Sequence, residues 1–314
     1  MESRTLIGLP ALPLFLAACA CRLPASPEEH LRTVVFQSDF GLSDGAVSAM
    51  KGVAQQVDSR LRLEDLTHAI EPFNVWEGAY RLNQTAAYWP ADTVFVLVVD
   101  PGVGTARRSI VARARTGHLF VTPDNGTLTF IAESLGIESA RRIDESGLRL
   151  PGSRASLTFH GRDVYSYVGA LLAAGKMSFE EVGLSLDPKS LVRLPYRRLV
   201  VEHLPDGVRW KGTVPVLDPK FGNVWTDIPT DRLRTTGIAW GNTLDIRIFH
   251  EEAVVFEGTL PYVETFGRVD KSQPLAYQNS LGNLSFAINQ GSFAERFGIG
   301  FGNTWYVEVR QNSL

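Results

Sequence analysis

Hydrophobic and polar residues alternate in two different ways along the chain, and the change falls near residue 190. Before it, continuous apolar runs such as 93–99 are typical of strands buried on both faces. Between these runs lie segments of helical spacing, among them 44–58, where Asp44 is placed to cap the first turn. Strands that alternate with helices predict an α/β domain with a mostly parallel sheet over residues 33–190.

Beyond a junction that we place at 188–196, the chain consists of short β-rich runs separated by turns that contain glycine or asparagine. Closely spaced strands of this kind are typical of antiparallel sheets. The pattern predicts a smaller antiparallel β domain over residues 197–312. The expected strands are 199–204, 213–217, 244–249, 253–258, 284–288 and 305–309.

The first residues differ in composition from the rest of the chain. Residues 1–18 carry one arginine and then an apolar run too short for a membrane-spanning helix, which needs about 20 residues. This segment predicts a secretory signal peptide. Its end, Leu16-Ala17-Ala18-Cys19, resembles the lipobox of bacterial lipoproteins, in which the cysteine becomes lipidated. The alternative is an ordinary signal peptide with Cys19 near its cleavage site.

Residues 19–32 are polar, contain two prolines and are predicted to form a tether. The protein is therefore expected to be exported. A lipid on Cys19 would be its only attachment to the membrane, and the folded part would face the periplasm or the cell surface.

The composition narrows the possible partners and cofactors. Hydrophobic residues make up 44% of the chain and charged residues 21%, as in soluble globular proteins. The net charge of −3 provides no basic surface for phosphate, so nucleic acid is not expected as a partner. The only cysteines, Cys19 and Cys21, precede the globular region, and no histidine pair has metal-ligand spacing. Neither a disulfide in the core nor a bound metal is expected.

Two aspartates stand where apolar runs end, Asp39 after 34–37 and Asp100 after 93–99. In an open parallel sheet, ligands bind beyond the carboxyl ends of the strands. Both carboxylates are therefore candidate site residues, although a single aspartate, taken alone, is more often a turn residue or a helix cap.

Two further segments carry candidate chemistry. His160 lies just before a predicted helix over 164–174 and could be a base, an orienting group or a metal ligand, but a single histidine more often only satisfies local backbone groups. Asp218, Phe221 and Asn223 place an acid, an aromatic ring and an amide within one turn, which suits a flat heteroaromatic ligand with polar substituents. The chain has no G-x-S-x-G elbow, so covalent hydrolase chemistry is not expected.

Six short segments, taken together and in this order, resemble the S-adenosyl-L-methionine (SAM) hydrolases, also called SAM hydroxide adenosyltransferases. This family is related to the SAM-dependent fluorinase and chlorinase. The resemblance extends over about residues 33–312. The segments are Ser38-Asp39-Phe40-Gly41, Val98-Val99-Asp100-Pro101-Gly102-Val103-Gly104-Thr105, Pro123-Asp124-Asn125-Gly126, Thr158-Phe159-His160-Gly161-Arg162-Asp163, Phe221-Gly222-Asn223-Val224-Trp225-Thr226 and Asn279-Ser280-Leu281-Gly282.

The resemblance implies hydrolysis of SAM to adenosine and L-methionine by attack of an activated water on the ribose 5′ carbon. In the family an aspartate, an arginine and a histidine hold that water, and these roles fall on Asp100, Arg107 and His160. The resemblance also implies an α/β domain followed by a β domain. It further implies a homotrimer whose sites lie between the α/β domain of one subunit and the β domain of its neighbour. SAM is the substrate, and no cofactor is implied.

The same resemblance assigns contacts to the substrate. Asp39 matches the acid that binds the ribose, and Phe73 matches an aromatic residue beside the substrate. Asp218 matches the acid at the methionine amino group, Asn223 the amide at the adenine, and Ser280 a residue near the methionine carboxylate. Further substrate contacts are expected from Asn125, Phe159, Phe221 and Phe266.

Two departures from the halogenases favour water over halide as the nucleophile. The halogenases carry an insertion after the strand that matches 109–114, and here 113–118 leaves no room for it. They also replace the aspartate and the histidine that this chain keeps. A SAM-dependent halogenase remains one alternative, and a surface lipoprotein that binds SAM or adenosine without turnover is the other. Leu281 stands where the fluorinase has an arginine, which leaves open how the methionine carboxylate is held.

Overall fold

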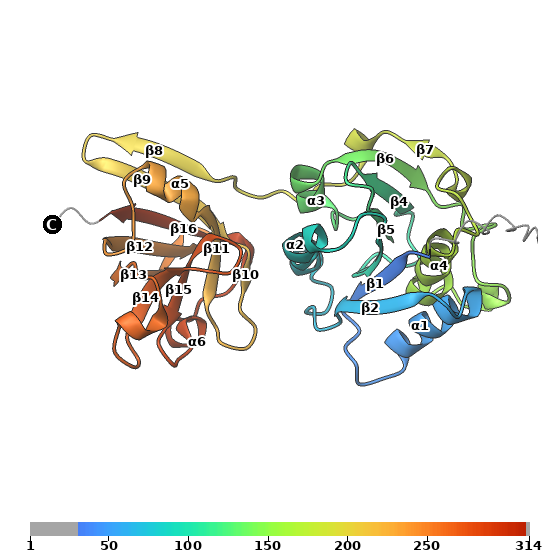
Figure 1. Cartoon of the computed structure of the whole chain (residues 1–314), viewed down its shortest axis with the longest axis horizontal. Helices are drawn as coiled ribbons and strands as arrows, with labels where there is room; N and C mark the ends of the chain where they lie inside the picture. The colour runs from blue at the N-terminus through green and yellow to red at the C-terminus, as the bar shows by residue number, and fades with distance from the viewer. Residues whose placement is uncertain (1–30, 312–314) are drawn as a thin grey trace, which may run out of the picture. The chain divides into compact units, whose positions relative to one another are not determined.

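A computed structural model describes residues 31–311 of the chain (Figure 1). The predicted signal peptide over 1–18, the lipidation of Cys19 and nearly all of the tether over 19–32 lie outside these residues and stay predictions. Within the described part, none of the helices combines the length and the hydrophobicity that crossing a membrane requires.

The first part of the chain forms a seven-stranded sheet in the order β2-β1-β3-β5-β4-β6-β7. The strands β2, β1, β3 and β5 run parallel, whereas β4 is antiparallel to both of its neighbours. This confirms the prediction of an α/β fold with a mostly parallel sheet. The strands are β1 (Thr33–Ser38), β2 (Arg62–Thr67), β3 (Val94–Val98), β4 (Ser109–Ala114), β5 (Leu119–Pro123), β6 (Ile137–Arg142) and β7 (Ser185–Leu186).

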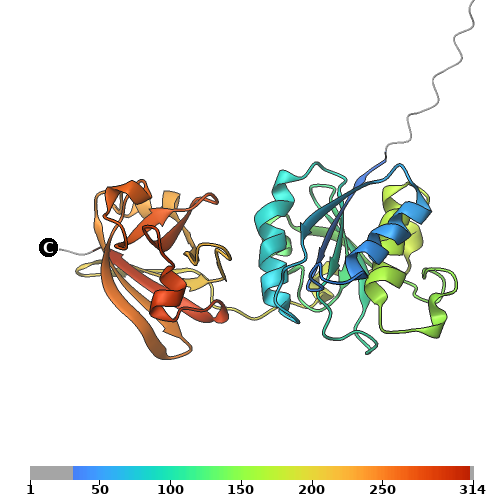
Figure 2. The ribbon, with the colours of Figure 1, turned by 90° about the horizontal axis from the view of Figure 1, so that it is seen from below.

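Helices cover both faces of this sheet, with α1 and α4 on one side and α2 on the other (Figure 2). Neighbouring residues of a strand point to opposite faces, so the apolar run of β1 fills both cores. Val34 and Phe36 belong to the core under α1 and α4, and Val35 belongs to the core under α2 and α3. The helices are α1 (Ala46–Val57), α2 (Val75–Thr85), the short 3-10 turn η1 (Ala86–Tyr88), α3 (Thr129–Ser134) and α4 (Tyr167–Ala173).

The first helix begins later than the sequence analysis expects. Gly45 is its N-cap residue, so the prediction that Asp44 caps the helix is wrong. Asp44 Oδ1 accepts a hydrogen bond from the Ala46 N–H at 2.9 Å. Aspartate commonly bonds the backbone two residues ahead in this way, and the carboxylate stabilises the turn that leads into α1.

The second part of the chain forms two antiparallel sheets, in the orders β13-β12-β16-β9-β8 and β10-β11-β15-β14. Their apolar faces share one core that includes Trp210, Ile246 and Phe286. This confirms the predicted antiparallel β fold, although β11 and β14 are not among the expected strands. The elements are β8 (Val200–Leu204), β9 (Gly207–Val214), β10 (Val216–Leu217), β11 (Val224–Pro229), α5 (Thr230–Thr235), β12 (Thr243–His250), β13 (Ala253–Pro261), β14 (Pro274–Gln278), β15 (Asn283–Ile288), α6 (Phe293–Phe297) and β16 (Gly302–Gln311).

Candidate active site

Asp100 and Arg107 meet at the edge of the sheet where the parallel strands end. Asp100 follows β3, and Arg107 precedes β4. Because β4 is antiparallel to β5, its beginning lies at the same edge as the ends of β5 and β3. The Arg107 guanidinium donates from Nε to Asp100 Oδ1 at 2.9 Å and from Nη2 to Asp100 Oδ2. This two-point contact fixes the relative orientation of the two groups.

Both partners of this ion pair are largely removed from water, with side chains 10% and 6% exposed for Arg107 and Asp100. Burial by itself lowers the pKa of Arg107, but the hydrogen bond to Asp100 and the nearby negative charges outweigh it and raise that pKa. Arg107 is therefore a permanent cation at the centre of the site.

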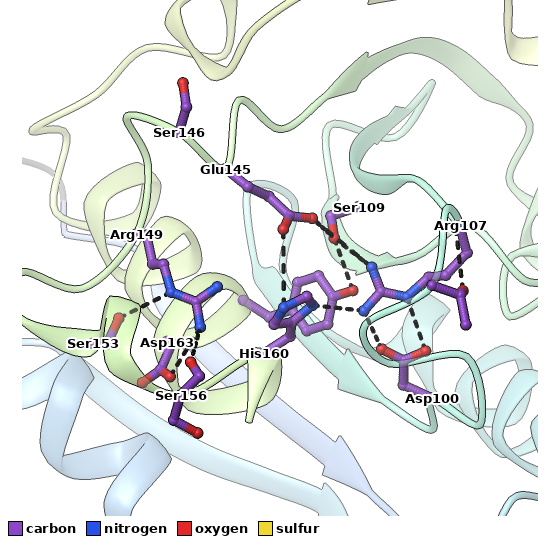
Figure 3. Close-up of polar contacts among 12 residues, drawn as sticks. Asp100, Arg107, Ser109, Glu145, Ser146, Arg149, Ser153, Ser156, His160 and Asp163 are labelled. Atoms are coloured by element: carbon purple, nitrogen blue, oxygen red, sulfur yellow. Dashed lines mark hydrogen bonds and ion pairs between the residues drawn. The ribbon is translucent and has the colours of Figure 1, made fainter. Parts of the chain in front are cut away.

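His160 completes the predicted trio (Figure 3). Its Nδ1 lies 2.8 Å from Nη2 of Arg107. A guanidinium can only donate, so Nδ1 is the acceptor and the proton of the neutral ring is assigned to Nε2. Burial, followed by the positive charges of Arg107 and Arg149, lowers the pKa of His160, although Glu145 and Asp100 act in the opposite direction. The imidazole is thus held neutral near pH 7.

The backbone after His160 is unusually wound. Residues Gly161–Ser166 form a π-helical turn, labelled η3, that continues into α4, so the helix predicted over 164–174 begins earlier and in another form. Turns of this type are rare and often occur at functional sites. A side chain at Gly161 would place its Cβ 2.9 Å from Val98 Cγ1, so only glycine lets η3 approach β3 this closely.

A buried charge cluster anchors the same turn. Asp163 is fully buried and accepts hydrogen bonds from Arg149 Nη2 at 3.3 Å and Arg162 Nε at 2.6 Å. Since Asp163 lies three residues after His160, this cluster fixes the position from which the imidazole reaches Arg107.

Three residues that the sequence analysis does not single out also contact the trio. Ser109 Oγ accepts a hydrogen bond from Arg107 Nη1 at 2.8 Å and donates to Glu145 Oε1 at 2.6 Å. The hydroxyl of Tyr165 lies 3.0 Å from the same Ser109 Oγ. Glu145 follows β6, whose end pairs with the start of β4, so the only sequence signal for it is a position at the same sheet edge.

Asp39 and Phe73 come together beside the end of β1. The Phe73 N–H donates to Asp39 Oδ2 at 2.8 Å. Phe73 has a positive φ of 67° and a side chain that is 70% exposed. An aromatic residue rarely adopts this backbone conformation, which the hydrogen bond to Asp39 supports here. The predicted ribose acid and the predicted aromatic contact are therefore neighbours.

Next to Asp39, a serine, a histidine and an aspartate side chain are linked in series by hydrogen bonds, and no sequence motif indicates this arrangement. Ser38 Oγ lies 2.7 Å from His68 Nδ1, and His68 Nε2 lies 3.0 Å from Asp65 Oδ1. Ser38 is fully buried and its Oγ also accepts from the Phe40 N–H at 3.3 Å. A hydroxyl that no substrate can reach is not a nucleophile, so this series of hydrogen bonds serves to hold the turn that presents Asp39.

Asn125 and Phe159 lie in the same part of the molecule but are engaged locally. Asn125 Nδ2 donates to the Val99 carbonyl at 2.8 Å, which ties the segment after β5 to the segment before Asp100. Phe159 packs edge-on against Phe40, with ring centroids 5.6 Å apart. Contact of either residue with substrate stays a prediction.

The predicted substrate residues of the β region line one pocket with a volume of 730 Å³. Its wall also includes the aromatic residues Trp225 and Tyr277. Burial raises the pKa of Tyr277 to about 12, so its hydroxyl stays protonated and can donate. The predicted residues in the wall are Asp218, Phe221, Asn223, Phe266 and Ser280.

The turn that forms one side of this pocket depends on local hydrogen bonds and on one glycine. Asp218 Oδ1 accepts from the N–H groups of Lys220 and Phe221 at 3.1 and 3.2 Å. Gly222 has a φ of +64°, and a Cβ there would lie 1.9 Å from Ser292 Oγ. No other residue fits this position without displacing Ser292.

Comparison with known proteins identifies the family to which both parts of the chain belong. The N-terminal domain of SAM hydroxide adenosyltransferases matches residues 34–183, and the C-terminal domain of the same proteins matches residues 212–306. The chain belongs to the SAM hydroxide adenosyltransferase family.

Relatives of this family include both hydrolases and halogenases. An (R)-S-adenosyl-L-methionine hydrolase of Salinispora arenicola is 37% identical over 263 residues, which cover 83% of this chain and 92% of the relative. A fluorinase of Actinopolyspora mzabensis is 31% identical over 284 residues, with 83% and 92% covered. The crystal structure of an uncharacterized conserved protein from Thermotoga maritima is 33% identical and superimposes with a TM-score of 0.78, over 88% of this chain and 99% of that one.

The connection between β4 and β5 tests whether this member of the SAM hydroxide adenosyltransferase family carries the insertion that is expected of halogenases. β4 and β5 are joined by the tight turn 115–118, in which the Ala114 N–H donates to the His118 carbonyl at 2.9 Å. The absence of an inserted loop at this point is confirmed for the described chain. Among residues 31–311, no group of three or more histidine, cysteine, aspartate or glutamate side chains is arranged to hold a metal ion.

Proposed function

We propose that this chain hydrolyses SAM to adenosine and L-methionine by attack of water on the ribose 5′ carbon. The observation that carries the proposal is the closed contact of Asp100, Arg107 and His160 at the carboxyl end of β3. The hydrolase relatives support the same chemistry.

The reaction needs little beyond a well-placed nucleophile. The C5′–S bond breaks with its electron pair going to the positively charged sulfur, so methionine leaves as a neutral thioether without a general acid. The C5′–O bond forms from water, and one proton is released. The trio's task is to hold the water in line with the C5′–S bond and to stabilise the positive charge that develops on its oxygen.

Substrate recognition is proposed to divide between two sets of residues. Asp39 and Phe73 contact the ribose side, beside the trio. In the β-region pocket, Asp218 binds the methionine amino group as an ion pair, and Asn223 binds the adenine edge. Aromatic walls formed by Phe221 and Phe266 suit the flat adenine ring.

We also propose the homotrimer and the export that the sequence suggests. Large apolar side chains are exposed near both sets of residues: Leu42 is 75% exposed, Leu157 60% and Phe221 60%. In the proposed trimer, a second copy of the chain would cover these side chains. Sedimentation of the purified protein tests for the trimer, and intact mass of protein from the membrane fraction tests for a lipidated Cys19.

The decisive experiment for the function is turnover of SAM by purified full-length protein. We expect adenosine and methionine in equal amounts, and in ¹⁸O-labelled water we expect the label in the adenosine 5′ hydroxyl. Because the hydrolase relatives are named for the (R)-sulfonium, we assay both epimers and expect the (R) form to react faster.

The same assay separates the alternatives. Added chloride or fluoride yields a 5′-halogenated nucleoside if the chain is a halogenase. Calorimetric SAM binding without any product indicates a binding protein. Either result would overturn the hydrolase proposal.

A further inference from the structure

Glu145 is the one carboxylate of the cluster that faces solvent, with a side chain 34% exposed. Its two oxygens approach two different members of the trio. Oε1 accepts from Ser109 Oγ at 2.6 Å and lies 3.9 Å from Arg107 Nη1. Oε2 lies 3.9 Å from His160 Nε2 (Figure 3). Glu145 therefore spans Arg107 and His160 on the side opposite Asp100.

The hydrogen bonds around Ser109 are compatible with only one arrangement of protons. The Glu145 carboxylate can only accept, so Ser109 Oγ donates its single proton to Oε1. The Tyr165 hydroxyl, which stays protonated because burial raises its pKa far above the usual range, must then be the donor to Ser109 Oγ. Arg107 Nη1 also donates to this oxygen, so both lone pairs of the hydroxyl are occupied. Glu145 is thus held by a series of hydrogen bonds that runs from the buried Tyr165 through Ser109.

The ring of His160 lies between Arg107 on one side and Glu145 on the other. Arg107 donates a hydrogen bond to Nδ1, so the proton of the neutral ring is on Nε2. Nε2 is the nitrogen that faces Glu145. At 3.9 Å the contact is an electrostatic one rather than a direct hydrogen bond. A negative charge at that distance stabilises a ring that carries hydrogen on Nε2.

We propose that Glu145 is a positioning residue of the water site, which fixes the orientation and the Nε2–H form of His160 and supplies a second negative charge to the reaction. The inference rests on the proposed function, because it names the part that Glu145 plays at the same site. It acts through His160 and Arg107, not by touching the reacting atoms.

The direction of charge movement gives the physical reason. Arg107 contributes one positive charge and Asp100 and Glu145 one negative charge each, so with a neutral His160 this set carries one net negative charge, whereas Arg149, which also faces the ring, is paired with Asp163. The substrate arrives as a sulfonium cation. As the C5′–S bond breaks, positive charge moves from sulfur to the attacking water and leaves as a proton. A net negative cluster stabilises this transition state, whereas Arg107 paired with Asp100 alone would be neutral.

Glu145→Gln removes the charge while the amide oxygen can still accept the hydrogen bond from Ser109. Glu138→Gln is the matched control, because Glu138 is an exposed glutamate on β6 near Glu145 in sequence. Neither substitution deletes a buried apolar group, so both variants are expected to fold, which circular dichroism and thermal unfolding check.

The first measurement needs no turnover. Histidine side-chain ¹⁵N NMR, assigned with His160→Gln, reports the ring tautomer and the pKa of His160 in the full-length protein. The groups that face this ring are Arg107, Arg149, Asp100 and Glu145, and Glu145 is the strongest of them in raising its pKa. We expect the Nε2–H form in the wild type and a lower pKa of His160 in Glu145→Gln. Glu138→Gln should leave both unchanged.

The second measurement is the pH profile of kcat. If the reaction requires neutral His160, the wild-type rate falls on the acid side as the ring becomes protonated. Glu145→Gln should move this limb to lower pH and reduce the plateau about 10- to 100-fold, the range known for residues that orient a functional histidine. A purely structural role would lower the rate without moving the limb.

The outcomes are distinguishable. An unchanged His160 pKa in Glu145→Gln, or a kcat profile identical to that of Glu138→Gln, overturns the inference. A shifted His160 pKa together with a wild-type protein that does not hydrolyse SAM would reject the hydrolase function and leave the placement of Glu145 supported.

Discussion

The two regions that carry the predicted site residues are organised in opposite ways. Around Arg107, charged side chains satisfy one another, and the two members of the central ion pair are at most 10% exposed. The pocket of the β region is open, with a volume of 730 Å³ and a wall residue, Phe221, that is 60% exposed. A closed cluster is ordered before the substrate arrives, whereas an open pocket is completed by its ligand. We therefore expect substitutions in the two regions to affect different kinetic constants.

The largest effect is expected for single alanine substitutions of Asp100, Arg107 and His160. Each should lower kcat by about 10² to 10⁴, the usual loss for one positioned acid–base or electrostatic group. SAM affinity should change much less, because the proposal assigns these groups to the water and not to the substrate. Steady-state kinetics and calorimetry on each variant measure the two quantities separately.

A control and a stability measurement accompany this prediction. Arg62→Ala removes an exposed arginine at the start of β2 and should leave kcat unchanged. Arg107→Ala should also lower the free energy of unfolding by about 3 kcal/mol, because it leaves Asp100 buried without its partner. If the three variants lose SAM binding in proportion to rate, the closed cluster is not a separate catalytic unit.

A smaller effect is expected in the β-region pocket. Asp218→Asn removes the negative charge but keeps an oxygen for the N–H groups of Lys220 and Phe221. Loss of an ionic contact to the methionine amino group should raise KM about 10-fold with kcat nearly constant. Asp218→Ala should raise KM further, because the turn also loses its hydrogen bonds.

The matched control for charge is Asp270→Asn, an exposed aspartate of the β region outside the pocket wall. The KM values and calorimetric SAM affinities of Asp218→Asn, Asp218→Ala and Asp270→Asn show whether the charge of Asp218 contributes to substrate binding. A drop in kcat at constant KM for Asp218→Asn would contradict the division between the two regions.

The last effect is expected on stability and not on catalysis, and it concerns how each region holds a carboxylate that is largely shielded from water. Asp100 is paired with Arg107, whereas Asp227 accepts a hydrogen bond from the Thr213 N–H at 2.7 Å. Burial raises the pKa of Asp227 to about 6. Between about pH 4 and 6 the folded chain keeps a proton that the unfolded chain has lost, so the free energy of unfolding falls as pH rises.

Asp227→Asn should therefore stabilise the protein by about 2 kcal/mol at pH 8, a value reduced for the partial exposure of the side chain. Below pH 3.5 the two proteins should have nearly equal stability, because both side chains are then neutral. Urea unfolding at the two pH values measures this, and Asp270→Asn should show no such pH dependence. An equal change at both pH values would attribute the effect to packing.

Some features of the fold follow from short stretches of sequence, and others do not. The run 93–99 identifies β3 because only a strand buried on both faces is apolar at every position. β11 escapes prediction because polarity does not follow burial along Val224–Pro229: the buried Thr226 is polar and the partly exposed Trp225 is apolar, so the alternation typical of a half-buried strand is missing from the sequence. Asp44 cannot be distinguished from an N-cap by sequence, because aspartate is favoured both as an N-cap and in the turn before a helix.

In the candidate site too, some residues can be predicted from short stretches of sequence and others cannot. The family resemblance carried by the motifs points to Asp100, to His160 and to Arg107, which lies two residues beyond the Asp100 segment, and the rule for parallel strands predicts the sheet edge at which Asp39 and Asp100 lie. Ser109, Glu145 and Tyr165 carry no motif. Glu145 reaches the site only because β4 and β6 are antiparallel to each other, which brings the end of β6 to the edge where Arg107 begins.

The sequence by itself determined the two kinds of sheet and pointed to the three residues proposed as the trio, because hydrophobic periodicity and short motifs are properties of neighbouring residues. Only the tertiary structure decided which side chains face one another: Arg107 with His160, 53 residues apart, and Ser109 with Glu145, 36 residues apart. Such contacts depend on strand order and direction, and on the burial that sets the proton positions of His160 and Tyr165. Neither strand order nor burial is encoded in any single segment of the chain.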